Sequence, residues 1–313
     1  MFDVVSKTFF HTLAGSPFLK KMASRYGIRP GGGGFARRFV AGETIEEAIA
    51  AARAIQASGL LITLDQLGES ATTAADAAAA TRGYLALIDR IAESGIERNL
   101  SLKLPQLGLG IDRATCVDNL RTILEKAGSL RFFVRIDMED SPHTDATLGI
   151  FETLWRHTHR NIGVVLQSML RRSEEDARRV NALGARVRLV KGAYNEPRTV
   201  AYQHKREVDA AFLRIAELLL KDGVYPAIAT HDPAMINETK AIASRLGVAK
   251  DRYEFQMLYG VRRDLQSMLA GAGYRVRVYT PFGTEWFPYF MRRLGERPAN
   301  VGFVLRGILA ERG

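Results

Sequence analysis

Eight short apolar runs recur along the chain, and nearly every one ends in a polar residue that a buried strand would not normally keep. They cover roughly residues 60–65, 99–104, 131–137, 161–167, 186–191, 224–231, 252–256 and 274–280. Helix-like segments alternate with them, near residues 73–95, 112–127, 145–158, 173–184, 199–222, 233–247, 261–272 and 285–296. This alternation predicts a parallel (β/α)8 barrel, the TIM-barrel class. Because the carboxyl ends of the strands meet at one mouth of such a barrel, the polar run ends predict an active site there.

The length of the chain suits one barrel with an added N-terminal segment. At 313 residues it exceeds the about 250 residues of a typical barrel. We expect one domain, with N-terminal helices in 1–58, the barrel in 59–300 and a C-terminal tail in 301–313. Residues 1–26 mix apolar side chains with lysine and arginine, which predicts short amphipathic helices that either pack on the barrel or lie on a membrane surface.

The chain is basic, with 44 Lys+Arg against 34 Asp+Glu and a net charge of +10. Such a balance suits solubility, a nucleic acid or an anionic membrane, but scattered basic pairs rather than one block favour solubility over nucleic-acid binding. Cys116 is the single cysteine, so no internal disulfide can form and a reducing compartment is expected. No run approaches the ~20 apolar residues of a membrane-spanning helix, and the start lacks the order of a signal peptide. We therefore expect a cytoplasmic location, with peripheral contact at the inner face of the cell membrane left open.

Four charged residues end predicted strands: Lys103, Asp137, Arg188 and Lys191. Any one of them could simply bond to the backbone of a loop. Taken together they favour function, because unpaired charges inside a barrel are costly. Three cations and a carboxylate at one mouth predict an anion-binding, acid–base site.

The last predicted helix carries a second group of polar residues. Thr284 can cap a helix that places Tyr289, Arg292, Arg293 and Glu296 three or four residues apart. Two arginines beside an aromatic ring can grip a carboxylate through paired hydrogen bonds, which lysine cannot imitate. The alternative is a solvated helix face with an internal Arg292–Glu296 pair.

Other kinds of site have little support. His157 and His159 lie two residues apart, so a helix would point them in different directions, and no His or Cys cluster has the spacing of metal ligands. There is no Gly-x-Ser-x-Gly motif of a serine hydrolase. The missing Gly-x-Gly-x-x-Gly argues against a Rossmann cofactor domain but not against a flavin held in a barrel.

In these residues the chain resembles the proline dehydrogenases, flavin enzymes built on a distorted eight-stranded barrel. The matching pieces follow the family's order, at residues 64–69, 101–103, 136–141, 187–194, 229–231, 253–260, 279–296 and 299–300. The most specific pieces are Arg-Leu-Val-Lys-Gly-Ala-Tyr at 188–194 and Tyr-x-x-Arg-Arg-x-x-Glu at 289–296. The resemblance implies FAD-dependent oxidation of L-proline to Δ1-pyrroline-5-carboxylate, the first step of proline catabolism to glutamate. A hydride would pass to flavin N5, and the electrons would continue to a membrane quinone.

The resemblance also implies roles for individual residues. Asp137 and Arg188 would be catalytic, with Arg188 against flavin N5. Lys103, Arg292 and Arg293 would bind the proline carboxylate, and Tyr279, Tyr289 and Leu258 would wall its ring. Glu69 would pair with Arg292 as a gate over the closed site. The FAD contacts would be Met138, Gln167, Arg188, Lys191, Gly192, Ala193, Thr230, His231, Gln256 and Glu296.

One departure and two alternatives stand beside this interpretation. Asp232 occupies a position where many relatives would have Asn, which leaves the adenine end of FAD less well determined. A barrel lyase or aldolase that forms a Schiff base on Lys103 or Lys191 is the alternative enzyme. A basic nucleic-acid or membrane-binding module is the alternative from another class, motivated by the net charge of +10. No nucleic-acid partner is expected.

Overall fold

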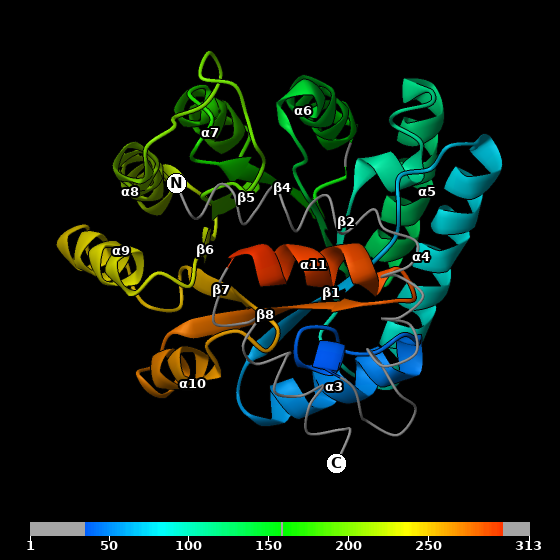
Figure 1. Ribbon diagram of the computed structural model, residues 1–313, viewed down its shortest axis with the longest axis horizontal. Coiled ribbons are helices and arrows are strands. Elements are labelled where there is room, and N and C mark those ends of the chain that lie inside the picture. Colours follow the sequence, from blue (N-terminus) through cyan, green and yellow to red (C-terminus); the bar gives the residue numbers. More distant parts are fainter. Residues whose placement is uncertain (1–34, 158, 297–313) are drawn as a thin grey trace.

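The computed structural model describes residues 35–157 and 159–296. Eight parallel strands close into one barrel, each bonded to the next in chain order and β8 bonded to β1 (Figure 1). The strands are β1 Leu61–Gln66, β2 Asn99–Leu102, β3 Phe133–Ile136, β4 Ile162–Gln167, β5 Arg186–Val190, β6 Ala227–Ala229, β7 Glu254–Leu258 and β8 Arg275–Phe282. The predicted (β/α)8 barrel is confirmed. The expected helices before residue 35 and the tail after residue 300 lie outside the described residues.

Helices follow the strands in regular alternation. After β1 to β7 come α4 Ala74–Ser94, α5 Arg113–Ser129, α6 Ser141–Arg156, α7 Ser173–Ala182, α8 Lys205–Asp222, α9 Pro233–Arg245 and α10 Arg263–Gly271, and α3 Ile45–Ala57 precedes β1. The described residues also contain two short 3-10 helices, η1 Phe35–Arg38 and η2 Leu104–Leu107. The predicted capping box of Thr44 and Glu47 is present at the start of α3.

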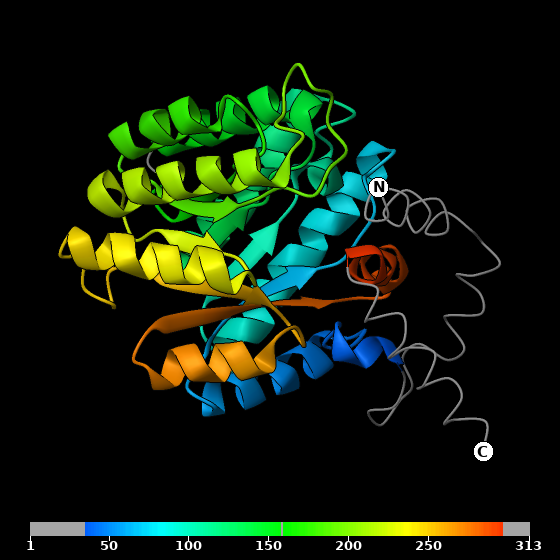
Figure 2. The same cartoon turned by 60° about the vertical axis from the view of Figure 1, so that its left-hand side comes forward.

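The last helix, α11 Trp286–Glu296, takes a different position from the others. It lies across the end of the barrel rather than beside it, at the side to which β8 leads (Figure 2). Phe290 packs on Phe39, with ring centroids 6.1 Å apart, and Trp286 donates a hydrogen bond to Glu43 at 2.9 Å. These contacts hold α11 over the carboxyl ends of the strands.

The two faces of the barrel strands differ in polarity because neighbouring residues of a strand point to opposite sides. Apolar residues such as Ile62, Leu64, Val134 and Leu189 are fully buried in the core that includes the surrounding helices. The alternate residues point into the barrel and are mostly polar, among them Thr63, Asp65, Ser101, Arg135, Arg188, Glu254 and Arg277. The barrel interior is therefore held together by ion pairs and hydrogen bonds.

The amino-terminal half of the interior contains a buried ion pair. Arg277 donates through Nε and Nη2 to the two oxygens of Glu254, at 2.8 and 2.9 Å, and through Nη1 to Glu97 at 2.7 Å. Burial alone would raise the pKa of Glu254, but Arg277 more than offsets it and the pKa is lowered. This end of the barrel is therefore filled and charge-paired, unlike the open mouth at the other end.

Gly163 on β4 makes room for a second buried arginine. Arg135 Nη1 donates to the carbonyls of Val164 and Arg186, at 3.1 and 2.7 Å. A Cβ added at Gly163 would lie 2.6 Å from Arg135 Nη1 and 2.5 Å from the Arg186 carbonyl oxygen. Any larger residue would therefore push Arg135 off its carbonyl partners.

We expect Gly163→Ala to lower the free energy of unfolding by about 1–3 kcal/mol, because it overpacks the barrel interior and disturbs a buried cation. Urea denaturation followed by circular dichroism measures the change. Gly110→Ala is the control, because a Cβ there would meet nothing within 4 Å, and it should change stability by less than about 0.5 kcal/mol. Equal stability of the two variants would contradict the packing argument.

Candidate active site

A cavity of about 630 Å³ opens at the carboxyl ends of the strands. This volume falls within the usual range of small-molecule sites, about 300–1,000 Å³. The lining includes fifteen of the residues predicted from the sequence: Lys103, Asp137, Met138, Gln167, Arg188, Lys191, Gly192, Ala193, Thr230, His231, Gln256, Leu258, Tyr279, Arg292 and Arg293. The structure thus brings most of the predicted site together in one place, although their individual roles stay predictions.

Two predicted residues lie outside the cavity lining, and the side chain of a third is not described. Tyr289 is buried on α11 and is not part of the cavity lining; the guanidinium groups of Arg292 and Arg293 lie 6.0 and 5.0 Å from its ring centroid. Glu69 lines a separate cavity of about 380 Å³ together with Glu285. The structure does not bring Glu69 into the large cavity, so its pairing with Arg292 stays a prediction. The side chain of Glu296, at the end of α11, is outside the described residues.

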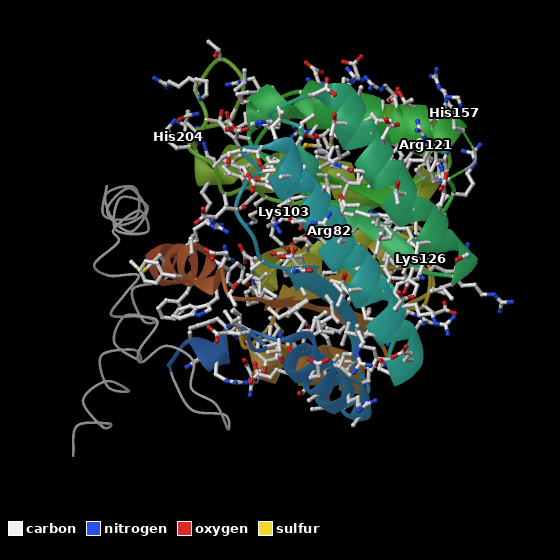
Figure 3. The ribbon with its side chains drawn as sticks, turned by 90° about the vertical axis from the view of Figure 1, so that its right-hand side faces the viewer. Arg82, Lys103, Arg121, Lys126, His157 and His204 are labelled. Carbon is white, nitrogen blue, oxygen red and sulfur yellow. The ribbon has the colours of Figure 1, made fainter. Side chains whose placement is uncertain are left out.

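Lys103 follows β2 and is held by side chains from β1 and β8. Its Nζ donates to both oxygens of Asp65, at 2.7 and 2.9 Å, and to the hydroxyl of Tyr279 at 3.3 Å. Asp137 Oδ2 is farther away, at 3.9 Å. In Figure 3 Lys103 lies near the middle of the view, whereas His157 lies near its edge. The ammonium group is therefore fixed at the mouth of the barrel.

Asp137 and Arg188 form the second ion pair of the mouth. Arg188 Nη1 donates to Asp137 Oδ1 at 2.7 Å, and Nη2 donates to Ser101 at 3.0 Å. Tyr279 donates its hydroxyl hydrogen to Asp137 Oδ2 at 2.8 Å, and the guanidinium of Arg188 lies 5.3 Å from the centre of the Tyr279 ring. Each partner thus restricts the orientation of the other two.

Protonation states follow from these contacts. Burial would lower the pKa of Lys103, but the carboxylates of Asp65 and Asp137 outweigh it and the pKa is raised. Burial, and then Asp137 and Asp65, raise the pKa of Tyr279 well above its ordinary value. At neutral pH Lys103 is therefore an ammonium group and Tyr279 a neutral phenol. An amine held in this state is a poor nucleophile, which argues against Schiff-base chemistry on Lys103.

Lys191 belongs to a ring of alternating charges on the far side of the cavity. Its Nζ lies 2.5 Å from Asp209 and 2.8 Å from Asp232. Lys205 completes the ring by pairing with the same two carboxylates. Asp232 also caps α9 by accepting from the backbone of Ala234 at 3.1 Å. The hydrogen bond from Lys191 is the main reason that the pKa of Asp232 falls to about 2.

The remaining wall includes Gly192, His231 and Gln167. Gly192 has a backbone φ of +102°, and a Cβ there would lie 2.6 Å from Met169 Cγ. His231 Nε2 accepts from the backbone N–H of Leu258 at 2.9 Å, so the proton of the neutral ring belongs on Nδ1. Gln167 donates to the carbonyl of Glu139 at 2.6 Å. These contacts fix the side chains of His231 and Gln167, to which the family resemblance gives a role in cofactor binding.

Two residues of the site were not among those predicted. Asp65 and Ser101 belong to the hydrogen-bond network of Lys103 and Arg188, although no role was assigned to them. The signal for Asp65 was its position at the end of the first apolar run.

Within residues 35–157 and 159–296, no group of three or more His, Cys, Asp and Glu has the geometry of a metal site. None of the described helices is both long and apolar enough to cross a membrane.

Comparison with known proteins gives a consistent result. The family model described as "Proline dehydrogenase" matches residues 48–306. Proline dehydrogenase 1 of Bacillus subtilis (strain 168) is 43% identical over 300 residues, which are 96% of this chain and 98% of the relative. Proline dehydrogenase of Deinococcus radiodurans is 43% identical over 278 residues, which are 88% of this chain and 90% of the relative.

A solved structure shares the same fold. It is proline utilization A (PutA) from Bdellovibrio bacteriovorus inactivated by N-propargylglycine, with a TM-score of 0.79 and 27% sequence identity. The match covers 89% of this chain but 34% of that protein. The chain therefore corresponds to about a third of this larger relative.

Asp232→Asn should lower stability near pH 7 by about 1 kcal/mol, a figure reduced for solvent screening of a partly exposed group. Its pKa is lower in the folded state, so its contribution is complete above the unfolded value, near 4, and is lost as the pH falls toward 2. The difference from the parent protein should therefore shrink between pH 5 and pH 3. Asn still caps the helix, which isolates the charge.

Urea denaturation at several pH values measures the effect of Asp232→Asn. Glu217→Gln, which breaks an exposed pair with Arg245, is the control and should change stability little at any pH. A deficit of Asp232→Asn that stays constant from pH 7 to pH 3 would rule out the assigned charge interaction.

Proposed function

The chain belongs to the proline dehydrogenase family, and from this membership we propose that it oxidises L-proline to Δ1-pyrroline-5-carboxylate with FAD, the first step of proline catabolism to glutamate. The observation that carries the proposal is one cavity that places Lys103, Arg292 and Arg293 beside the Asp137–Arg188 pair. A group of cations next to a fixed ion pair suits a small amino acid whose carboxylate must be held while its ring reacts.

The residues of the cavity fit FAD. The buried atoms Arg188 Nε and Gln256 Oε1 have no hydrogen-bond partner within the described part of the chain, and each can bond to a ligand in the cavity. Gly192 has a positive φ that favours glycine, and Met169 occupies the place of a Cβ, so the backbone of Gly192 forms part of the cavity wall. When bound, FAD would supply N5 as the hydride acceptor and pass the electrons on to a membrane quinone. The residues that would hold it are Met138, Gln167, Arg188, Lys191, Gly192, Ala193, Thr230, His231 and Gln256.

The substrate would be held by its carboxylate. Arg292 and Arg293 present planar guanidinium groups that match carboxylate oxygens, and Lys103 adds a point charge. Tyr279 and Leu258 would wall the ring from the strands. Tyr289 would act from behind the arginines, because its ring packs against their guanidinium groups.

The Asp137–Arg188 pair would orient the reaction. Both oxygens of Asp137 already accept hydrogen bonds, from Arg188 and from Tyr279, so its role in this geometry is to fix those two groups. Arg188 in turn presents a fixed positive charge at the cavity wall. Such a charge stabilises negative charge that develops close to it, at no cost of reorganisation.

The Schiff-base alternative has no observation in its favour. A nucleophilic lysine needs a neutral amine, whereas Lys103 has a raised pKa and Lys191 lies between two carboxylates.

We also propose that the protein is cytoplasmic and touches the inner face of the membrane peripherally, because a membrane quinone must reach it. The scattered basic residues give no support to a nucleic-acid partner.

The proposal predicts that the purified protein is yellow and that anaerobic L-proline bleaches its flavin absorbance. The reason is direct transfer of two electrons from substrate to cofactor. An absorbance spectrum before and after addition of L-proline is the measurement, with D-proline as the control. A protein that stays colourless after incubation with FAD would refute the proposal.

Arg292→Lys should raise the KM for proline about tenfold while flavin content stays constant, because lysine loses the paired hydrogen bonds to the carboxylate. Steady-state kinetics and the ratio of flavin to protein absorbance measure the two effects. Arg82→Lys on the exposed face of α4 is the matched control and should change neither. An unchanged KM in Arg292→Lys would show that the carboxylate binds elsewhere.

A further inference from the structure

Asp65 is the most deeply buried acid of the mouth, with no exposed side-chain area. It lies near the end of β1, and both of its oxygens accept from Lys103, whereas the side chain of Lys103 is 21% exposed. A carboxylate is costly to bury unless it is paired and hydrogen-bonded. Asp65 therefore has a specific partner, and that partner faces the cavity.

We infer that Asp65 is a positioning residue for substrate binding: it holds Lys103 as an ammonium group aimed at the substrate carboxylate. The inference rests on the proposed function, because it takes a proline carboxylate as the group that Lys103 binds. Asp65 itself does not line the cavity, so it would act through Lys103.

The hydrogen bonds of Lys103 set the place of its ammonium group. An ammonium group has three N–H donors and no acceptor. Its Nζ donates to both oxygens of Asp65, at 2.7 and 2.9 Å, and to the hydroxyl of Tyr279, which accepts from Lys103 because its own hydrogen goes to Asp137. Lys103 also lines the cavity, so its positive charge faces a ligand there. Asp65 and Tyr279 together thus set the position of this charge.

The surrounding charges make Asp65 the main counter-ion of Lys103. The titratable and charged groups around Lys103 are Asp65 on β1, Tyr84 on α4, Asp137 and Glu139 after β3, Arg188 on β5, Tyr279 on β8, and Arg292 and Arg293 on α11. Asp137 lies at 3.9 Å and is already bonded to Arg188 and Tyr279. Without Asp65, burial and the nearby arginines would favour a neutral Lys103, which binds a carboxylate poorly.

Binding of cyclopentanecarboxylate to the holoenzyme tests this role. The compound has a proline-like ring and a carboxylate but no amine, so only the protein titrates between pH 6.5 and pH 9. Calorimetric titration should show pH-independent affinity for the parent protein. In Asp65→Asn the affinity should be at least about tenfold lower at pH 9 and should recover as the pH falls, because acid restores the ammonium group. Glu97→Gln, a carboxylate-to-amide change at the other ion pair of the barrel, should behave like the parent.

A double-mutant cycle separates positioning from general stability. If Asp65 acts through Lys103, Asp65→Asn should weaken binding no further in a Lys103→Met background. This double variant also removes the unpaired buried charge, so it should fold even where Asp65→Asn alone does not.

Two results would overturn the inference: weakened binding in Asp65→Asn that is the same at every pH, or a double variant that binds clearly worse than Lys103→Met alone. Failure of the proposed function would be seen separately, as a parent protein that L-proline does not bleach.

Discussion

Charged side chains inside the barrel need polar partners, because they lie where water is largely excluded, and this constraint shapes the barrel interior. Arg135 donates to two backbone carbonyls, whereas other buried cations are matched by carboxylates. At the amino-terminal end Arg277 is matched by Glu254 and Glu97. At the mouth Lys103 is matched by Asp65, and Arg188 by Asp137. An unpaired ion in such a place costs several kcal/mol, so each pair depends on the strand register that brings its members together. The hydrophobic core lies outside these pairs, between strands and helices.

The same pairing explains why the mouth is suited to chemistry. Lys103 and Arg188 are each held by a fixed carboxylate, so their positions are set before a ligand arrives. Loops add to this preorganisation. Tyr194 donates to Glu139, and Glu196 accepts from the backbone and the hydroxyl of Ser141, so the loop after β5 is joined to the loop after β3. Binding energy is then not spent on ordering the site.

The barrel and the position of its mouth could be predicted from the sequence, because strand-end polar residues follow directly from local pattern. Some element boundaries differ from the prediction. The strand expected over residues 224–231 is shorter in the structure, where β6 covers Ala227–Ala229. Helix α6 begins at Ser141, before the expected residue 145. Pro142 in the first turn of α6 is a local signal of this start. The hydrogen bond from Ser141 to Glu196 also lies at the start of α6, but it joins residues 55 positions apart and has no local signal in the sequence.

The ion pairs of the site could not be predicted in the same way. Asp65 and Lys103 are 38 positions apart, and nothing local marks them as partners. Tyr289 illustrates the limit on α11, since helical spacing placed it next to the arginines but could not say that it packs behind them. The pairing and the packing depend on how β1, β2 and α11 meet in three dimensions.

The most direct measurement of the central claim is a crystal structure of the protein with FAD and cyclopentanecarboxylate. The account predicts that the flavin lies along the wall formed by Gln167, Lys191 and Gln256, and that Lys103, Arg292 and Arg293 bond to the carboxylate. A flavin in another place, or a carboxylate bound away from Lys103, would contradict it.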